Sequence, residues 1–378
     1  MRLARIVRDE RGLTLVEMLI AIVMMSVVLF TFYGLIGVGV RGWGAMEGQM
    51  DVQQQPRVAL GRIAAEVRQA RDFVIGDNGR ALGLAKVTVL TQDAAAGATT
   101  LVVEDASVLA QGRPLVILSL DRLERATVTA IAGNSITVGS PLARAHRAGE
   151  LIRRGQTAVS GPVLAGTLVF LVDDASVLQA GDLVAVGDEG PLTVAGVAGN
   201  SVTISQALAQ SHPDGEVVQP LSVMFQCDSG CPASGAQVIR CTQGCTTAGN
   251  RVPLADLISP VPGRNMFVAV VSSLSSPAAQ GATQVCLGSV SGFAVDDRVQ
   301  VGREEHRATS LDLPDRTAVT GITGSCLNLS RGLSRGHAAG TSARVHLVEI
   351  SARSTQTSDA LGGQVQEVLV TTRAGLRN

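Results

Sequence analysis

Apolar and polar positions divide the chain into three zones. Residues 18–40 contain no charged side chain over 23 positions, enough for a helix to cross the hydrocarbon core of a bilayer. After Pro56, which is expected to kink or interrupt the helix, apolar residues recur at spacings of three and four and predict an amphipathic helix ending near residues 76–79. This stripe consists of Leu60, Ile63, Val67, Ala70 and Val74. Beyond residue 80, short runs of Val, Ile, Leu and Thr between turn residues predict β-strands.

Three segments of this β-rich part repeat one another. They open with GATTLVVEDASVLAQGRPLVIL, GTLVFLVDDASVLQAGDLVAVG and GATQVCLGSVSGFAVDDRVQVG, and each ends in the pattern L-[AS]-x-x-H-x-x-G. That pattern places His146, His212 and His337 at equivalent points. Because each histidine belongs to a different copy, we expect it to close a turn by hydrogen bonding to the backbone rather than to bind a metal. Each copy, about 60 residues long, predicts a small β-roll or barrel-like module with four or five short strands.

The N-terminus combines a basic stub with a retained apolar run. Four arginines face two acids in residues 1–12, so this stub should stay cytoplasmic and the rest of the chain should lie outside. A secretory signal peptide ends in a small-residue cleavage site after its apolar core. Here the small residue, Gly12, comes before the apolar run, and cleavage there would leave the apolar helix as the new N-terminus.

The segment Gly12-Leu13-Thr14-Leu15-Val16-Glu17 resembles the class III signal of type IV prepilins and type II secretion pseudopilins. The resemblance implies that prepilin peptidase cleaves between Gly12 and Leu13 and that the new amine of Leu13 is methylated. It also implies that Glu17, the fifth mature residue, acts in assembly. Leu13 stands where the family usually has Phe.

A lone carboxylate in lipid is unfavourable by about 2.5 kcal/mol or more. Cleavage at Gly12 would create a second charge, the amine of Leu13, and the two could neutralise each other within one subunit or between neighbours. A broken pair is costly, so the pair can set the register of assembly. The alternative is an ordinary membrane anchor that tolerates Glu17 near the interface.

The segments outside the repeats are expected to form one antiparallel sheet. They are residues 81–90, 220–227, 236–241, 265–271, 345–354 and 366–378. The last two resemble the end of minor pilins of the W type and pseudopilins of the J type, which finish in Leu-Arg-Asn. We therefore expect an α+β fold, with a long N-terminal helix packed on an antiparallel pilin sheet and three inserted all-β repeat modules.

This reading gives the chain eight segments. They are a cytoplasmic leader (1–12), a transmembrane assembly helix (13–40), an amphipathic helix with the first sheet strand (41–92), β-repeat 1 (93–155), β-repeat 2 (160–219), the pilin sheet (220–271), β-repeat 3 (272–344) and the C-terminal sheet strands (345–378).

Six cysteines all follow the predicted membrane span. Four of them form two C-x3-C pairs that flank a predicted hairpin, Cys227 with Cys231 and Cys241 with Cys245. The other two, Cys286 and Cys326, fall on expected neighbouring strands of the third repeat. An even number in an oxidising compartment favours disulfides, and six cysteines allow about 15 connectivities. We expect a Cys286–Cys326 bridge; a zinc site made by the four C-x3-C cysteines is the alternative.

The net charge and the sequence motifs reduce the number of possible functions. The 378-residue chain has a net charge of −1, which gives no global preference for nucleic acid or anionic lipid. It contains no G-x-S-x-G, H-E-x-x-H or P-loop motif, and acids such as Asp173 and Asp174 border β-runs as turn residues do. We expect a structural protein, not an enzyme, with no cofactor and no metal.

The expected function is that of a minor pilin-like subunit of a type IV pilus. Three bulky modules would crowd a close-packed shaft, so a place near the filament tip is expected. The expected partners are other pilin or pseudopilin subunits, prepilin peptidase and the inner membrane, which the chain would cross once before joining a periplasmic or cell-surface filament.

Three alternatives remain open. They are a J-like pseudopilin of type II secretion, a tip receptor that binds DNA or a surface through the repeats, and a membrane-anchored repeat protein with no filament role. DNA binding needs a local basic patch, and the densest one in the repeats is Arg144, Arg147, Arg153 and Arg154. Without residues 1–12 the chain has 27 basic and 30 acidic side chains, which argues against DNA.

Overall fold

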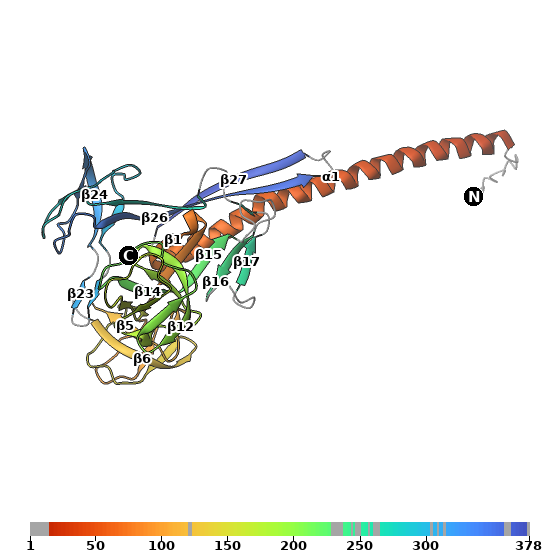
Figure 1. The fold of residues 1–378 in the computed structure, drawn as a ribbon. Coiled ribbons are helices and arrows are strands. Elements are labelled where there is room, and N and C mark those ends of the chain that lie inside the picture. The colour runs from red at the N-terminus through yellow and green to blue at the C-terminus, as the bar shows by residue number, and fades with distance from the viewer. Residues whose placement is uncertain are drawn as a thin grey trace, which may run out of the picture.

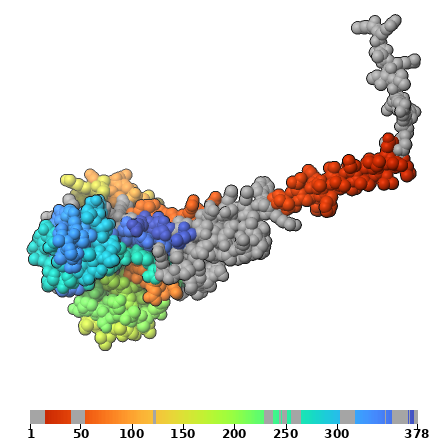
Figure 2. Space-filling view, turned by 90° about the horizontal axis from the view of Figure 1, so that it is seen from above, coloured from red at the N-terminus to blue at the C-terminus, as the bar shows by residue number. Residues whose placement is uncertain are grey.

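A long helix projects from a β-rich body (Figure 1). The structure, a computed structural model, describes residues 15–119, 123–227, 237–242, 245, 251–255, 258–259, 265–302, 305–307, 310–312, 315–358 and 364–375. Seen from above, the N-terminal half of the helix stands well away from the body (Figure 2). The molecule therefore has two parts, a rod and a broad head.

The helix α1 (Leu15–Gln69) continues through Pro56, so the predicted interruption there is wrong. A proline removes one i→i−4 hydrogen bond, and the second half of the helix is held by burial instead. Leu60, Ile63 and Val67 are at most 3% exposed, which places the predicted apolar stripe in the core.

The helix ends at Gln69, earlier than the predicted 76–79. Residues Ala70–Gly76 form the strand β1, which pairs antiparallel with β2 (Ala81–Lys86). Between them lies the short 3-10 helix η1 (Asp77–Gly79). Phe73, Val74 and Ile75 favour a strand, and their backbones find partners on β2 that a longer helix would lose.

A five-stranded antiparallel sheet, in the order β1-β2-β15-β16-β17, forms one side of the head. Its remaining strands are β15 (Val223–Cys227), β16 (Val238–Cys241) and β17 (Arg251–Ala255). β2 and β15 are direct neighbours, with Leu84 opposite Val223. Strands far apart in the sequence therefore share one sheet.

Three units, which we call units 1, 2 and 3, repeat one strand order. Unit 1 (residues 88–154) contains β3 (Thr88–Val89), β4 (Thr100–Val102), η2 (Ala106–Val108), β5 (Pro114–Leu118), β6 (Leu123–Ala132), β7 (Ser135–Val138) and β8 (Leu151–Arg154). Unit 2 (residues 157–221) contains β9 (Thr157–Ala158), β10 (Val169–Leu171), η3 (Ala175–Val177), β11 (Leu183–Val186), β12 (Glu189–Ala198), β13 (Ser201–Ile204) and β14 (Val217–Leu221). Unit 3 (residues 267–345) is built from β19 (Phe267–Ser273), β20 (Gln284–Cys286), β21 (Arg298–Val301), β24 (Asp315–Thr323), β25 (Cys326–Leu329) and the start of β26 (Ser342–Ser358).

The three orders are β3-β8-β5-β6-β7-β4, β9-β14-β11-β12-β13-β10 and β19-β26-β21-β24-β25-β20. Each unit has its own apolar core. In each unit the first strand pairs with the last, so the chain enters and leaves at the same place. The first strands begin before the predicted repeat starts at 93, 160 and 272.

Unit 3 differs from the other two because its outer strands are longer. β26 extends to Ser358 and pairs with β27 (Gln364–Gly375) and β18 (Ile258–Ser259). A small hairpin of β22 (Glu305–Arg307) and β23 (Ser310–Asp312) lies between β21 and β24 in the sequence. Unit 3 is therefore continuous with the sheet that covers the helix.

The expected single sheet is in fact two. Residues 267–273, 342–358 and 364–375 pair with one another, whereas β2, β15 and β16 belong to the five-stranded sheet. The predicted strand 81–90 is also divided, because β2 ends at Lys86 and Thr88–Val89 pairs with β8. The strands follow their backbone partners, which the apolar pattern does not specify.

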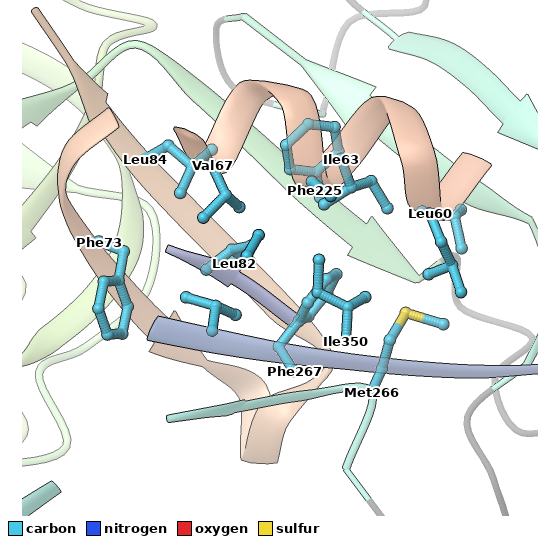
Figure 3. Packing of buried hydrophobic residues seen from close by; sticks show 14 of the residues in the cluster. Leu60, Ile63, Val67, Phe73, Leu82, Leu84, Phe225, Met266, Phe267 and Ile350 are labelled. Atoms are coloured by element: carbon cyan, nitrogen blue, oxygen red, sulfur yellow. The ribbon is translucent and has the colours of Figure 1, made fainter. Parts of the chain in front are cut away.

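One core joins the helix to both sheets (Figure 3). Ile63 and Val67 of α1 pack with Leu82 and Phe225 of the five-stranded sheet and with Ile350 of β26, and all five are at most 1% exposed. Burial of a large apolar side chain contributes about 1.5–3 kcal/mol. The second half of α1 is thus a structural part of the head.

Arginines connect the units to their neighbours. Arg344 of β26, 3% exposed, lies 2.7 Å from the carboxylate of Asp72, donates to the carbonyl of Phe73 and stacks 5.3 Å from that ring. Between units 1 and 2, Arg113 donates to the carbonyls of Ser176 and Leu178. Burial lowers the pKa of Arg113, against the raising effect of the Asp182 charge.

Candidate functional site

The first half of α1 is an exposed apolar rod. Residues Leu15–Gly39 are long and apolar enough to cross a membrane, and none of the most apolar stretch is buried in the head. Leu15, Phe30 and Tyr33 are each more than 80% exposed. Such a surface in water is strongly unfavourable, so this segment is suited to lipid or to neighbouring helices.

Two hydroxyl side chains of this segment are hydrogen-bonded within the helix. The Ser26 hydroxyl donates to the carbonyl of Ile22 at 2.7 Å, and the Thr31 hydroxyl donates to the carbonyl of Val28 at 2.8 Å. In a bilayer every polar group needs an internal partner. These two hydroxyls meet that requirement.

Glu17 is the only charged residue between Leu15 and Gly39. It lies in the first turn of α1, where the partial positive charge of the helix N-terminus favours a carboxylate. The sequence-predicted cleavage residues Gly12 and Leu13 lie outside the described residues. Among the described residues, Glu17 thus lies in the first turn of the rod, at the end remote from the head.

A buried ion cluster attaches the second half of α1 to the five-stranded sheet. Glu66 of α1 accepts hydrogen bonds from Arg240 of β16 at 2.6 and 3.2 Å and pairs with Lys86 of β2 at 2.8 Å. Burial alone raises the pKa of Glu66, but the hydrogen bonds and charges of Arg240 and Lys86 outweigh that effect and leave the pKa below its ordinary value. The sequence did not reveal this cluster, because Glu66 and Arg240 are 174 positions apart.

The described cysteines are oxidised. Cys286 and Cys326 lie directly opposite each other on β20 and β25 and form a disulfide, and Cys241 is bonded to Cys245. Cys227 is also disulfide-bonded, and Cys231 lies outside the described residues. Among the residues that the structure describes, no group of three or more His, Cys, Asp or Glu side chains could hold a metal ion.

The three histidines hold equivalent loops, each in its own unit. The backbones of His146, His212 and His337 form bridges to Ala94, Val163 and Ala278. The expected hydrogen bonds from the ring to the backbone are wrong for two of them. The ring nitrogens of His146 lie 2.9 Å from Glu124 and 2.7 Å from Glu150, and Nε2 of His212 lies 3.1 Å from Glu189.

A cleft of about 760 Å³ is lined by residues of unit 2 and of the five-stranded sheet. Its lining includes Asp77, Asn78, Asp188 and Glu189. Glu189 also accepts hydrogen bonds from backbone amides of the loop that carries His212. This carboxylate therefore holds the loop of unit 2.

The comparisons with known proteins concern the N-terminus. Residues 7–33 match the family model of the prokaryotic N-terminal methylation motif, and this stretch contains Gly12, Leu13 and Glu17. No curated protein matches the chain. The chain thus carries the N-terminal methylation motif of type IV pilins and pseudopilins, followed by an apolar helix that could span a membrane.

Proposed function

We propose that the chain is a minor pilin-like structural subunit of a type IV pilus. Prepilin peptidase cleaves it between Gly12 and Leu13, the amine of Leu13 is methylated, and α1 carries the subunit from the inner membrane into the filament. The observation that carries this proposal is the methylation motif at residues 7–33, at the start of an exposed apolar helix.

The geometry of α1 supports the two stages of this function, residence in the membrane and insertion into the filament. Its first half exposes apolar side chains on all sides, so it can exchange lipid for neighbouring helices with little change in apolar contact. Its second half is fixed by the core and by the pair of Glu66 with Arg240. A filament built on the first half would therefore carry the head as a rigid attachment.

Glu17 pairs in this proposal with the amine of Leu13, in the same subunit or in a neighbour. Both charges would lie in an apolar environment, where an unpaired charge is far more costly than a paired one. The pair accordingly selects the correct axial position of each incoming subunit. The role is one of recruitment, and cleavage at Gly12 is a separate step.

We further propose that the three units are insertions in a pilin head and that the subunit sits near the filament tip. The units lie at the end of the head remote from the start of α1 (Figure 1), where their width would hinder lateral packing in a shaft. A J-like pseudopilin of type II secretion shares the same N-terminal signal and is the second candidate.

A tip receptor for DNA is less well supported. Of the predicted basic cluster, Arg144 and Arg147 are exposed, but Arg153 is only 5% exposed and Arg154 pairs with Asp182 at 3.0 Å. Two exposed arginines provide few phosphate contacts.

Mass spectrometry of the membrane fraction tests the processing step. The mature protein is expected to begin at Leu13 with a methylated amine. An intact Met1 terminus, or cleavage after residue 30, would contradict the proposal.

Glu17→Gln tests the recruitment step. The variant is expected to be cleaved normally and to remain in the membrane, with a loss of about a hundredfold or more from sheared filaments, since breaking a buried pair costs about 3–5 kcal/mol. Ser26→Ala, in the same helix, is the control and should enter filaments normally. Wild-type incorporation of Glu17→Gln would show that Glu17 does not drive recruitment. If the protein is absent from sheared pili but required for secretion, the pseudopilin candidate replaces the pilin.

A further inference from the structure

The three units allow each surface position to be compared with its counterparts. Thr100 of unit 1, Val169 of unit 2 and Gln284 of unit 3 pair with equivalent residues on the neighbouring strand. The turns just before them are also equivalent, because Gly97, Gly166 and Gly281 share a positive φ of 80–86°. A residue that is present in one unit and absent from the other two is therefore not required by the fold.

Unit 2 alone carries an apolar surface at this edge. The four residues, which we call the edge patch, are Leu164 (72% exposed), Leu168 (47%), Val169 (53%) and Leu171 (54%). Their counterparts are Ala95, Thr99, Thr100 and Val102 in unit 1, and Ala279, Thr283, Gln284 and Cys286 in unit 3. Units 1 and 3 build the same turn and strand with smaller or more polar side chains, so this turn and strand can form without the leucines of unit 2.

The edge patch lies on and beside the last strand of a sheet, with its apolar side chains exposed. β10 is the last strand in the order of its sheet and pairs with β13 on one side. On its other side the carbonyl of Leu171 accepts a hydrogen bond from the amide of Ser160 at 2.8 Å, so this edge is partly closed at Leu171. Natural edge strands usually carry polar or charged side chains that prevent association, as Thr100 and Gln284 do in the other units. Val169 and Leu171 instead present apolar side chains on the exposed face, on either side of the buried Phe170.

The charge of unit 2 specifies the partner. Residues 157–221 contain seven Asp or Glu and no Lys or Arg, whereas units 1 and 3 each contain six acids and seven arginines. Two of the acids flank the edge patch. Asp173, which is exposed, follows Leu171 by two residues, and Asp214 accepts a hydrogen bond from the amide of Gly161, three residues before Leu164.

We propose that the edge patch is a docking site for a protein segment that carries apolar side chains and a net positive charge. The apolar side chains would cover the leucines, and the cationic groups would face the acids of unit 2. The same acids repel DNA and anionic lipid, so neither is the occupant. This site lies on the lobe of unit 2, green at the lower edge of Figure 2, and it does not depend on the proposed filament role.

The test uses a variant that copies unit 1 into unit 2. Leu164→Ala, Leu168→Thr, Val169→Thr and Leu171→Val are combined in the full chain. These residues are already accepted at the equivalent positions of unit 1, so the variant should fold. Val295→Thr, which removes an exposed apolar residue (53%) from unit 3, is the matched control.

The probe is a labelled peptide that alternates lysine and valine over about seven residues, the length of a short strand. Its binding to the full chain in neutral detergent is measured by fluorescence anisotropy, with detergent alone as background. The wild-type chain and Val295→Thr should bind the peptide at least about tenfold more tightly than the fourfold variant. Binding should weaken as salt screens the charges, and a glutamate–valine peptide should bind no better to the wild type than to the variant.

Three results would overturn the proposal. The first is equal binding of the lysine–valine peptide by the wild type and the fourfold variant. The second is equal binding of the two peptides by the wild type, which would leave no role for the acids. The third is self-association of the wild-type chain that the fourfold variant abolishes, because the occupant would then be a second copy. Circular dichroism of the variant confirms that any loss of binding reflects the surface and not the fold.

Discussion

Replacement of Glu66 by glutamine should loosen the joint between the helix and the head. The change keeps the size of the side chain and removes the charge that pairs with Arg240 at 2.6 Å and with Lys86 at 2.8 Å. The side chains of Lys86 and Arg240 are only 11% and 20% exposed, so both cations would be left partly buried without their counter-ion.

The magnitude follows from this geometry. Removing one partner of a buried ion pair costs about 3–5 kcal/mol. We expect the lower end, about 3 kcal/mol, because Lys86 also donates to Gln69 at 3.3 Å and keeps that bond. At about 1.4 kcal/mol per tenfold change, local opening of the end of α1 should become about a hundredfold more frequent.

Hydrogen exchange followed by mass spectrometry measures this opening. Amides of residues 59–69 should lose about two decades of protection at neutral pH, whereas those of unit 2 should be unchanged. Asp173→Asn, which neutralises an exposed acid far from the helix, is the control. Protection of residues 59–69 within about threefold of the wild type would refute the assignment of the ion cluster as the joint.

The pH dependence gives an independent check. The pKa of Glu66 is lowered in the folded state. The stability that its ion pairs give to the folded joint is therefore fully present above pH 4.5, the ordinary pKa, and is lost as the pH falls from there through the lowered pKa. The wild-type joint should therefore weaken under acid conditions. The Glu66→Gln joint should be weak throughout, with a flatter response to acid in this segment.

Three further predictions concern stability. Replacing Cys286 and Cys326 by serine removes a disulfide that spans 40 positions. The loss should destabilise the folded unit by about 4 kcal/mol, the loop-closure entropy of such a link. Proteolysis within residues 274–345 should therefore be faster than in the wild type, and an unchanged cleavage rate would contradict this prediction. Phe225→Ala, at a site with 0% exposure, should cost about 3–5 kcal/mol in urea unfolding, whereas Val252→Ala, at a site 43% exposed, should stay within about 0.5 kcal/mol. Gly61→Ala adds a methyl group to α1 with nothing within 4 Å and should stabilise the helix by up to about 1 kcal/mol; a lower unfolding midpoint would count against this account.

The sequence predicted the features that depend on local pattern. The charge-free run, the stripe at Leu60, Ile63 and Val67, and the three equivalent histidines are all periodic or repeated, and each corresponds to a structural element. The expected helix end was wrong because Ala70 and Val74 continue the helical spacing by chance while their backbones pair with β2. Local spacing does not report such a competing partner.

The sequence also did not predict which residues far apart in the chain pair with one another. The six non-repeat segments were all recognised as strands, but their division into two sheets depends on which neighbours β26 and β2 choose. The Glu66–Arg240 pair and the carboxylates around His146 likewise join residues that no local pattern relates. Lys86 is the only lysine in the chain, but the sequence alone assigned it no role and did not indicate its partner.

The pairing of β2 with β15 has a consequence for how this architecture can change. The amide of Lys86 donates to the Ser222 hydroxyl at 3.2 Å across 136 positions of sequence, and the amide of Ser222 donates to the carbonyl of Leu84 at 2.8 Å. The chain thus leaves the five-stranded sheet and returns to it through one narrow gap. The entropy of closing a loop grows only logarithmically with its length, so the number of residues inserted at this gap has little effect on the stability of the sheet. Packing restricts which unit can change: Leu183, Ala185 and Leu221 of unit 2 share a buried cluster with the five-stranded sheet, whereas none of the described residues of unit 1 belongs to this cluster. Lineages or designers could therefore duplicate or exchange unit 1 more readily than unit 2 while the helix and its sheet stay as they are.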